Sequence, residues 1–179
     1  MIENMVFEFG QDPCPTISWC SPESDGSYRE SIEKLISYVE SCGYSVEFRN
    51  DPYSCCDHAD KTIYIQSRLG EKRKYYVLLH EIGHMIYALR YINMETGDPI
   101  GYIMQYQGIA SKNMSKQRET SRRFRVAQVH EELDAWRKGM DLAHTLQLEL
   151  NAYDYMDLAY RSVGTYIKAA SEYCRDYVW

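Results

Sequence analysis

The 179-residue sequence lacks any apolar run near the ~20 residues that a membrane-spanning helix needs. It also lacks an excess of positive charge. Its 20 Lys+Arg face 26 Asp+Glu, and the formal net charge of -6 disfavours a general nucleic-acid binder. The start, Met1–Met5, has an acid and no basic stretch or apolar core, so no secretory leader is expected. The protein is therefore predicted to be cytoplasmic.

The sequence contains no CxxC pair, although it has six cysteines. Without an export signal, these cysteines are expected to be reduced thiols rather than disulfides. The stretch Cys55-Cys56-Asp57-His58 could supply soft metal ligands, but adjacent cysteines chelate poorly. Ordinary loop thiols are the favoured interpretation. The six cysteines are Cys14, Cys20, Cys42, Cys55, Cys56 and Cys174.

Hydrophobic periodicity predicts a mainly helical α+β fold, with a small β-sheet packed on one helix and two further long C-terminal helices. The length and the 45% hydrophobic content suit one domain, 1–179, with a long loop or insertion at about Asn93–Arg125. Ser27 and Asn151 are expected to cap helices, and Gly43 to end one. The expected strands are Thr16–Cys20, Tyr44–Arg49 and Lys61–Gln66, and the expected helices are Tyr28–Cys42, Glu71–Tyr91, Val126–Leu150 and Asn151–Cys174.

One motif stands out, the HExxH pattern formed by residues 80–84 inside a predicted helix. Two histidines four residues apart project from one helix face, so His80 and His84 can bind one zinc ion together. Glu81 lies beside the ion, where it can take a proton from water and pass it to a leaving amine. A chain of this composition would contain the pattern by chance roughly 0.01 times. Gly83 costs ~1 kcal/mol of helix stability relative to Ala, which predicts that a strand or the substrate approaches closely there.

A third protein ligand is needed, because catalytic zinc sites bind three side chains and leave the fourth position open. The longer HExxHxxGxxH pattern is absent, since the residues after His84 contain no further histidine. Carboxylates or histidines further along the chain remain as candidates. The segment His130–Trp136, on a helix that could pack against the motif helix, offers several.

Several motifs of the chain together resemble those of a known family. A strand like Thr62–Ile65, a helix with Leu-His-Glu-Ile-Gly-His and a later helix with Glu-x-x-Ala are similar to the ImmA/IrrE-like zinc metallopeptidases of the HExxH gluzincin type. The similarity covers about Lys61–Tyr91 and Val126–Ala143, and the stretch from Ala135 to Gly139 is most similar to phage-encoded members. The resemblance implies a Zn²⁺ cofactor, Glu132 as the third ligand, and a protein substrate such as a specific regulator.

The geometry of the predicted helix also favours Glu132 as the third ligand. Glu131 and Glu132 are adjacent, so their side chains point about 100° apart and only one can face the metal. Glu132 lies on the side of Ala135 and Gly139, where small residues let another helix come close. Glu131 lies in a row with Asp134 that is expected to be solvated. The same helix is expected to bury a stripe formed by Val129, Leu133, Trp136 and Met140.

Other signals are weaker. Tyr87, one turn beyond His84, is a candidate transition-state donor. His130 and His144 could support the site but are more typical of surface histidines. Trp136 and the tyrosine-rich last helix are expected to belong to the core. The basic patch at Lys112–Arg125 could bind an acidic segment or nucleic acid, but a solvated loop is the favoured interpretation.

The sequence therefore predicts a zinc-dependent metallopeptidase in which His80, His84 and Glu132 bind the metal and Glu81 moves protons. The alternative is a catalytically silent zinc-binding regulatory or protein-interaction module. A third hypothesis is a protein that binds a partner through its basic insertion. Glu81 argues against a silent module, because metal binding alone does not need that carboxylate.

Overall fold

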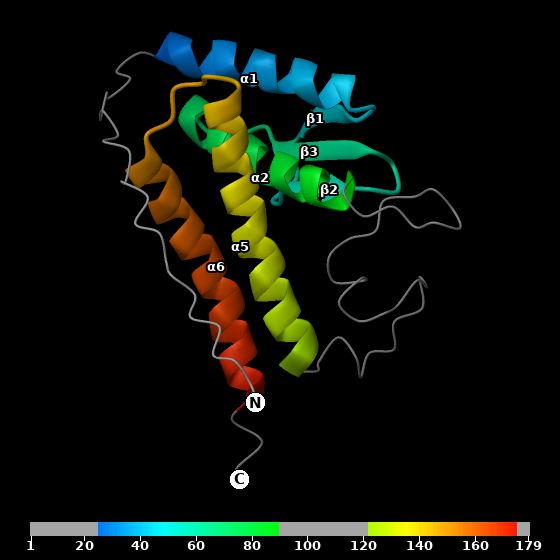
Figure 1. Ribbon diagram of the computed structural model, residues 1–179, viewed down its shortest axis with the longest axis vertical. Coiled ribbons are helices and arrows are strands. Elements are labelled where there is room, and N and C mark those ends of the chain that lie inside the picture. The colour runs from blue at the N-terminus through cyan, green and yellow to red at the C-terminus, as the bar shows by residue number, and fades with distance from the viewer. Residues whose placement is uncertain (1–24, 90–121, 175–179) are drawn as a thin grey trace, which may run out of the picture.

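The computed structural model describes residues 25–89 and 122–174 and shows a mainly helical α+β fold with a small mixed sheet (Figure 1). The expected strand at Thr16–Cys20 and most of the expected insertion lie outside the described residues. Arg122–Arg125, assigned to that insertion, belong instead to a helix. The elements are α1 (Asp25–Ser41), β1 (Ser45–Arg49), β2 (Cys55–Asp57), β3 (Thr62–Gln66), α2 (Glu71–Leu89), α5 (Arg122–Thr145) and α6 (Ala152–Cys174).

The three strands are ordered β1-β3-β2, with β3 in the centre. β1 runs parallel to β3, and Ser45 pairs with Thr62 at the start of that register. β2 runs antiparallel to β3, and Cys56 pairs with Ile63. The sequence prediction missed β2 because its three residues are too short for a recognisable alternation and follow a polar turn. This edge strand nevertheless brings Cys56 to the same face of the sheet as the fully buried Ile63.

Local signals set most of the helix ends. Gly43 follows α1 with a φ of 78°, the left-handed conformation that glycine adopts most easily, so the expected helix stop is confirmed. The Oδ1 atom of Asn151 accepts a hydrogen bond from the Asp154 amide at 3.1 Å, which confirms it as the cap of α6. The expected cap at Ser27 is wrong, because α1 begins at Asp25 and Ser27 lies inside it.

The helices enclose the core with α2 at its centre. Figure 1 shows α5 and α6 running antiparallel and side by side, with α1 across one end and the strands beside α2. Buried side chains of α2 include Tyr75, Leu78 and Leu79. The predicted stripe on α5 is partly wrong, because Leu133 is 38% exposed while Trp136 is buried. The face that α5 buries is the one with the small residues, because α5 packs closely on α2.

Two glycines allow this close packing of α2 and α5. A Cβ built on Gly83 would lie 1.9 Å from the Ala135 carbonyl oxygen of α5. A Cβ built on Gly139 of α5 would lie 2.5 Å from the Leu79 carbonyl oxygen of α2. The close neighbour predicted for Gly83 is therefore a helix, rather than the strand or substrate that the sequence suggested. The close contacts at these two glycines determine where along α2 the carboxylates of α5 lie relative to the HExxH motif.

Among the described helices, none is both long and apolar enough to cross a membrane. Cys42, Cys55 and Cys56, the cysteines whose side chains the structure describes, are free thiols.

Candidate metal centre

The HExxH motif lies in the middle of α2, with its polar side chains buried. His80 is 7% exposed and Glu81 is 6% exposed. Because the histidines are one helical turn apart, their rings meet, with ring centroids 4.7 Å apart. The two Nε2 atoms face each other at 3.3 Å. Two nitrogens held at this separation inside the protein need a positive charge or a proton between them.

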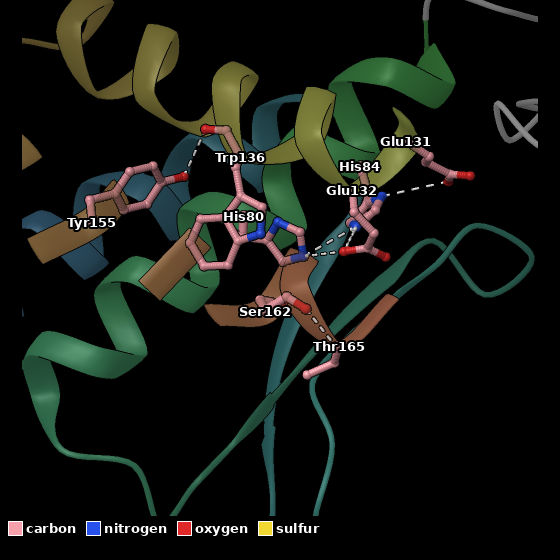
Figure 2. Close-up of polar contacts among 8 residues, drawn as sticks. All are labelled: His80, His84, Glu131, Glu132, Trp136, Tyr155, Ser162 and Thr165. Atoms are coloured by element: carbon pink, nitrogen blue, oxygen red, sulfur yellow. Dashed lines mark hydrogen bonds and ion pairs between the residues drawn. The ribbon is translucent and has the colours of Figure 1, made fainter. Parts of the chain in front are cut away.

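Glu132 of α5 completes a group of three donor atoms (Figure 2). Its Oε2 lies 3.3 Å from His80 Nε2 and 3.8 Å from His84 Nε2. These distances suit a metal ion, since two ligands of a tetrahedral zinc are about 3.3 Å apart. The circle through the three atoms has a radius of about 2.0 Å, close to a zinc–ligand bond length. The three residues therefore fit a zinc ion in both chemistry and spacing.

The charges around these atoms also fit a cation. Burial would raise the pKa of Glu132, but its hydrogen bond with His80 and the charge of His84 lower it overall. Burial would lower the pKa of His84, but Glu131 and the charges of Glu81 and Glu132 raise it to about 9. Three carboxylates therefore surround two imidazoles in a largely buried place, and a divalent cation bound there would offset that negative charge.

Glu81 lies beside the three donor atoms without belonging to them. Burial raises the pKa of Glu81 above its usual range, although the His80 and His84 rings act in the opposite direction. Its carboxylate is hydrogen-bonded to the backbone of Cys56 on β2. The edge strand β2 thus holds the one carboxylate of the HExxH motif, which is not among the three donor atoms.

The environment of Glu131 differs from the one that the sequence predicted. The sequence placed it in a solvated row, but its side chain is only 17% exposed and its Oε1 lies 3.6 Å from His84 Nδ1. An acceptor on the second ring nitrogen of a liganding histidine fixes the tautomer and orientation of that ring. Glu131 is therefore placed to orient His84. The prediction from the sequence missed this role because it asked only whether Glu131 could face the metal.

We expect Glu131→Gln to weaken zinc binding by about 10–100-fold, because the neutral amide orients His84 less well than the carboxylate. The measurement is a titration against a competing chelator. Glu132→Ala should weaken binding further, because it removes a donor atom itself. Equal affinity of Glu131→Gln and the wild type would show that the 3.6 Å contact does not orient His84.

The other histidine is held by an aromatic side chain. The rings of His80 and Trp136 stack with centroids 4.3 Å apart and an interplanar angle of 18° (Figure 2). The Tyr155 hydroxyl donates a hydrogen bond to the Trp136 carbonyl at 3.0 Å. His80 Nδ1 is buried and has no hydrogen-bond partner in the described part of the chain. Trp136 was predicted to be core, and it is, but it also fixes the plane of a candidate ligand.

Two cavities open onto the candidate metal centre. The larger has a volume of about 540 Å³ and the smaller about 270 Å³, and both are lined by His80, Glu81, Glu132 and Tyr166. Tyr166 of α6 also hydrogen-bonds to Glu132. The sequence assigned Tyr166 to the core because it lies on the apolar stripe of its helix.

The remaining expected site residues are further from this arrangement. Tyr87 is half-buried and does not line either of these two cavities, so its role as a donor stays a prediction. His130 and His144 are exposed on α5. Of the basic patch, only Arg122, Arg123 and Arg125 fall within described residues, in the first turn of α5.

Comparisons with family models, curated proteins and solved structures find no match to this chain. The ImmA/IrrE-like resemblance therefore stays a prediction that rests on the motif residues.

Proposed function

We propose that this protein is a zinc-dependent metallopeptidase that hydrolyses a protein substrate. The observation that carries the proposal is the meeting of three donor atoms from His80, His84 and Glu132, with a fourth buried group, Glu81, beside them. A site that only stored metal would not need the additional carboxylate.

In this proposal His80, His84 and Glu132 hold the ion, and Glu131 and Trp136 orient the two histidines. When bound, zinc acts as a Lewis acid that polarises a carbonyl and makes a nearby water more acidic. The protein's own contribution is a fixed donor set, which arises because α2 and α5 approach closely at their glycines. No large rearrangement is then needed to form the site.

Glu81 acts as general base and then as general acid. It accepts a proton from the attacking water and delivers that proton to the leaving amine. Burial raises its pKa, which brings the carboxyl closer to the range where it can both accept and release a proton near neutral pH. The hydrogen bond with the Cys56 backbone keeps the carboxylate aimed at the cavity.

Tyr166 is a second candidate, beside Tyr87, for stabilising the developing oxyanion. Burial and the charge of Glu132 raise the pKa of Tyr166 well above its usual range, so its hydroxyl keeps its proton. A protonated hydroxyl at the cavity wall can donate a hydrogen bond to charge that develops in the transition state.

The larger cavity is the proposed substrate cleft. It runs from the donor atoms past Ser54 and Gln66 on the sheet side to Leu158 and Thr165 on α6. Its volume of about 540 Å³ is in the range of ordinary ligand sites and suits a short stretch of peptide. We propose that this activity operates in the cytoplasm.

Removing the metal should abolish hydrolysis. We expect protein dialysed against a chelator to lose cleavage of a pool of short peptides followed by mass spectrometry, and about one equivalent of Zn²⁺ per chain to restore it. Protein dialysed without chelator is the control. Cleavage that persists in protein shown to be free of metal would contradict the proposal.

A further inference from the structure

Cys56 and His58 lie on the wall of the smaller cavity, next to the candidate metal centre but outside its three donors. Cys56 Sγ is 3.6 Å from His58 Nδ1. Two ligands of a tetrahedral zinc, one sulfur and one nitrogen, are about 3.5–3.6 Å apart when their bonds to the ion are ~2.3 Å and ~2.0–2.1 Å. The pair therefore has the spacing of two adjacent ligands of one ion.

The fold holds this pair in place. Cys56 is the middle residue of β2, paired with Ile63 of the central strand. His58 follows directly in a turn that Asp57 fixes, since its Oδ1 accepts hydrogen bonds from the amides of Ala59 and Asp60 at 2.9 and 3.1 Å. The two candidate ligands thus come from one β-hairpin, where the Tyr44 hydroxyl also contacts His58 Nδ1 at 3.3 Å.

Glu131 is a nearby acidic residue on the same cavity, although its oxygens do not form a three-atom donor group with Cys56 and His58 among the described residues. Its Oε2 is buried without a hydrogen-bond partner in the part of the chain that the structure describes. A buried carboxylate oxygen without a partner is costly, and a nearby cation relieves that cost. Glu131 Oε1 meanwhile contacts His84, so this side chain lies between the HExxH centre and the Cys56–His58 pair.

The local charge also suits a cation. Burial, followed by the charges of carboxylates including Glu81 and Glu131, raises the pKa of the Cys56 thiol. The same negative charges that disfavour a free thiolate favour a divalent ion that would bind it.

We propose that Cys56 and His58 form a second metal site, with Glu131 at its edge, for a zinc-like cation that binds thiolate and imidazole. An ion there occupies the cavity that leads to the HExxH centre, so excess metal should inhibit any activity of that centre. The inference concerns metal binding and does not rest on the peptidase activity.

Cobalt(II) tests the proposal, because thiolate ligation of cobalt gives a strong near-ultraviolet charge-transfer band and the His₂Glu centre contains no thiolate. Full-length protein is stripped of metal, kept reduced with a phosphine and titrated with Co²⁺. We expect two equivalents to bind and the charge-transfer band to grow with one of them. Cys56→Ser and His58→Gln should each lose that equivalent and the band, with circular dichroism confirming that they remain folded.

Cys55→Ser is the matched control. Cys55 is the neighbouring, exposed thiol; it pairs with Tyr64 and also lines the smaller cavity, but it is not one of the two proposed ligands, so this variant should keep both equivalents and the band. His80→Ala, which disables the HExxH centre, should also keep the band, so the two sites can fail separately. A wild-type protein without the band, or a band that survives Cys56→Ser, would overturn the proposal. If a second equivalent of Co²⁺ bound without the band, that equivalent would be assigned to surface histidines. This result would also overturn the proposal.

Discussion

Glu81→Gln should keep the metal and lose hydrolysis. The amide has the size of the carboxylate but cannot accept a proton from water, and general acid–base catalysis of this kind contributes about 10²–10⁴-fold in rate. Because Glu81 does not belong to the three-donor group, zinc affinity should change little. The measurements are the cleavage rate of the peptide pool and the zinc content of the same preparation.

Glu71→Gln is the control for this variant. It makes the same chemical change in the first turn of the same helix, at a residue paired with Lys74 rather than with the motif. It should keep both metal and activity. A wild-type cleavage rate in Glu81→Gln would show that Glu81 is not the proton carrier, even if the metal site were assigned correctly.

Gly83→Ala should destabilise the protein strongly, although alanine is the better helix former by ~1 kcal/mol. The added Cβ would lie 1.9 Å from the Ala135 carbonyl oxygen, a backbone atom that cannot move without shifting α5. Overpacking a tight contact costs about 1–3 kcal/mol or more, so we expect the upper end of that range and a melting temperature lower by roughly 10 °C. Thermal denaturation followed by circular dichroism measures the effect.

Gly164→Ala provides the comparison. Gly164 lies in the exposed part of α6, and a Cβ built on it meets nothing within 4 Å. Only the helix-propensity gain remains, so this variant should be as stable as the wild type or more stable by up to ~1 kcal/mol. If Gly83→Ala also gained stability, the close crossing of α2 and α5 would be wrong.

The sequence predicted the parts of the fold that local patterns determine. The four helices and the strands β1 and β3 were all expected, because each carries its own periodicity or its own cap. β2 was missed because three residues form a strand here only by pairing with β3, which is tertiary information.

The candidate site divides in the same way. His80, Glu81 and His84 are adjacent in sequence, so one helix places them together, and small neighbours pointed to Glu132 on the second helix. Glu131 was wrongly placed in a solvated row, and the contacts of Trp136 and Tyr166 with the site were not predicted, because these environments depend on how α5 and α6 pack against α2. A charged residue in an apparently polar row, or an aromatic residue in an apolar stripe, gives no local sign of a nearby site.

The zinc content of protein purified without added metal tests the metal centre most directly. Elemental analysis of the wild type should find about one zinc per chain at the HExxH centre, and Glu132→Ala should hold well under half of that, because it removes one of the three donor atoms of that centre. The Cys56→Ser background removes any contribution from the second site. Equal zinc in Cys56→Ser and in Cys56→Ser/Glu132→Ala, or none in either, would contradict the assignment of His80, His84 and Glu132 as one metal centre.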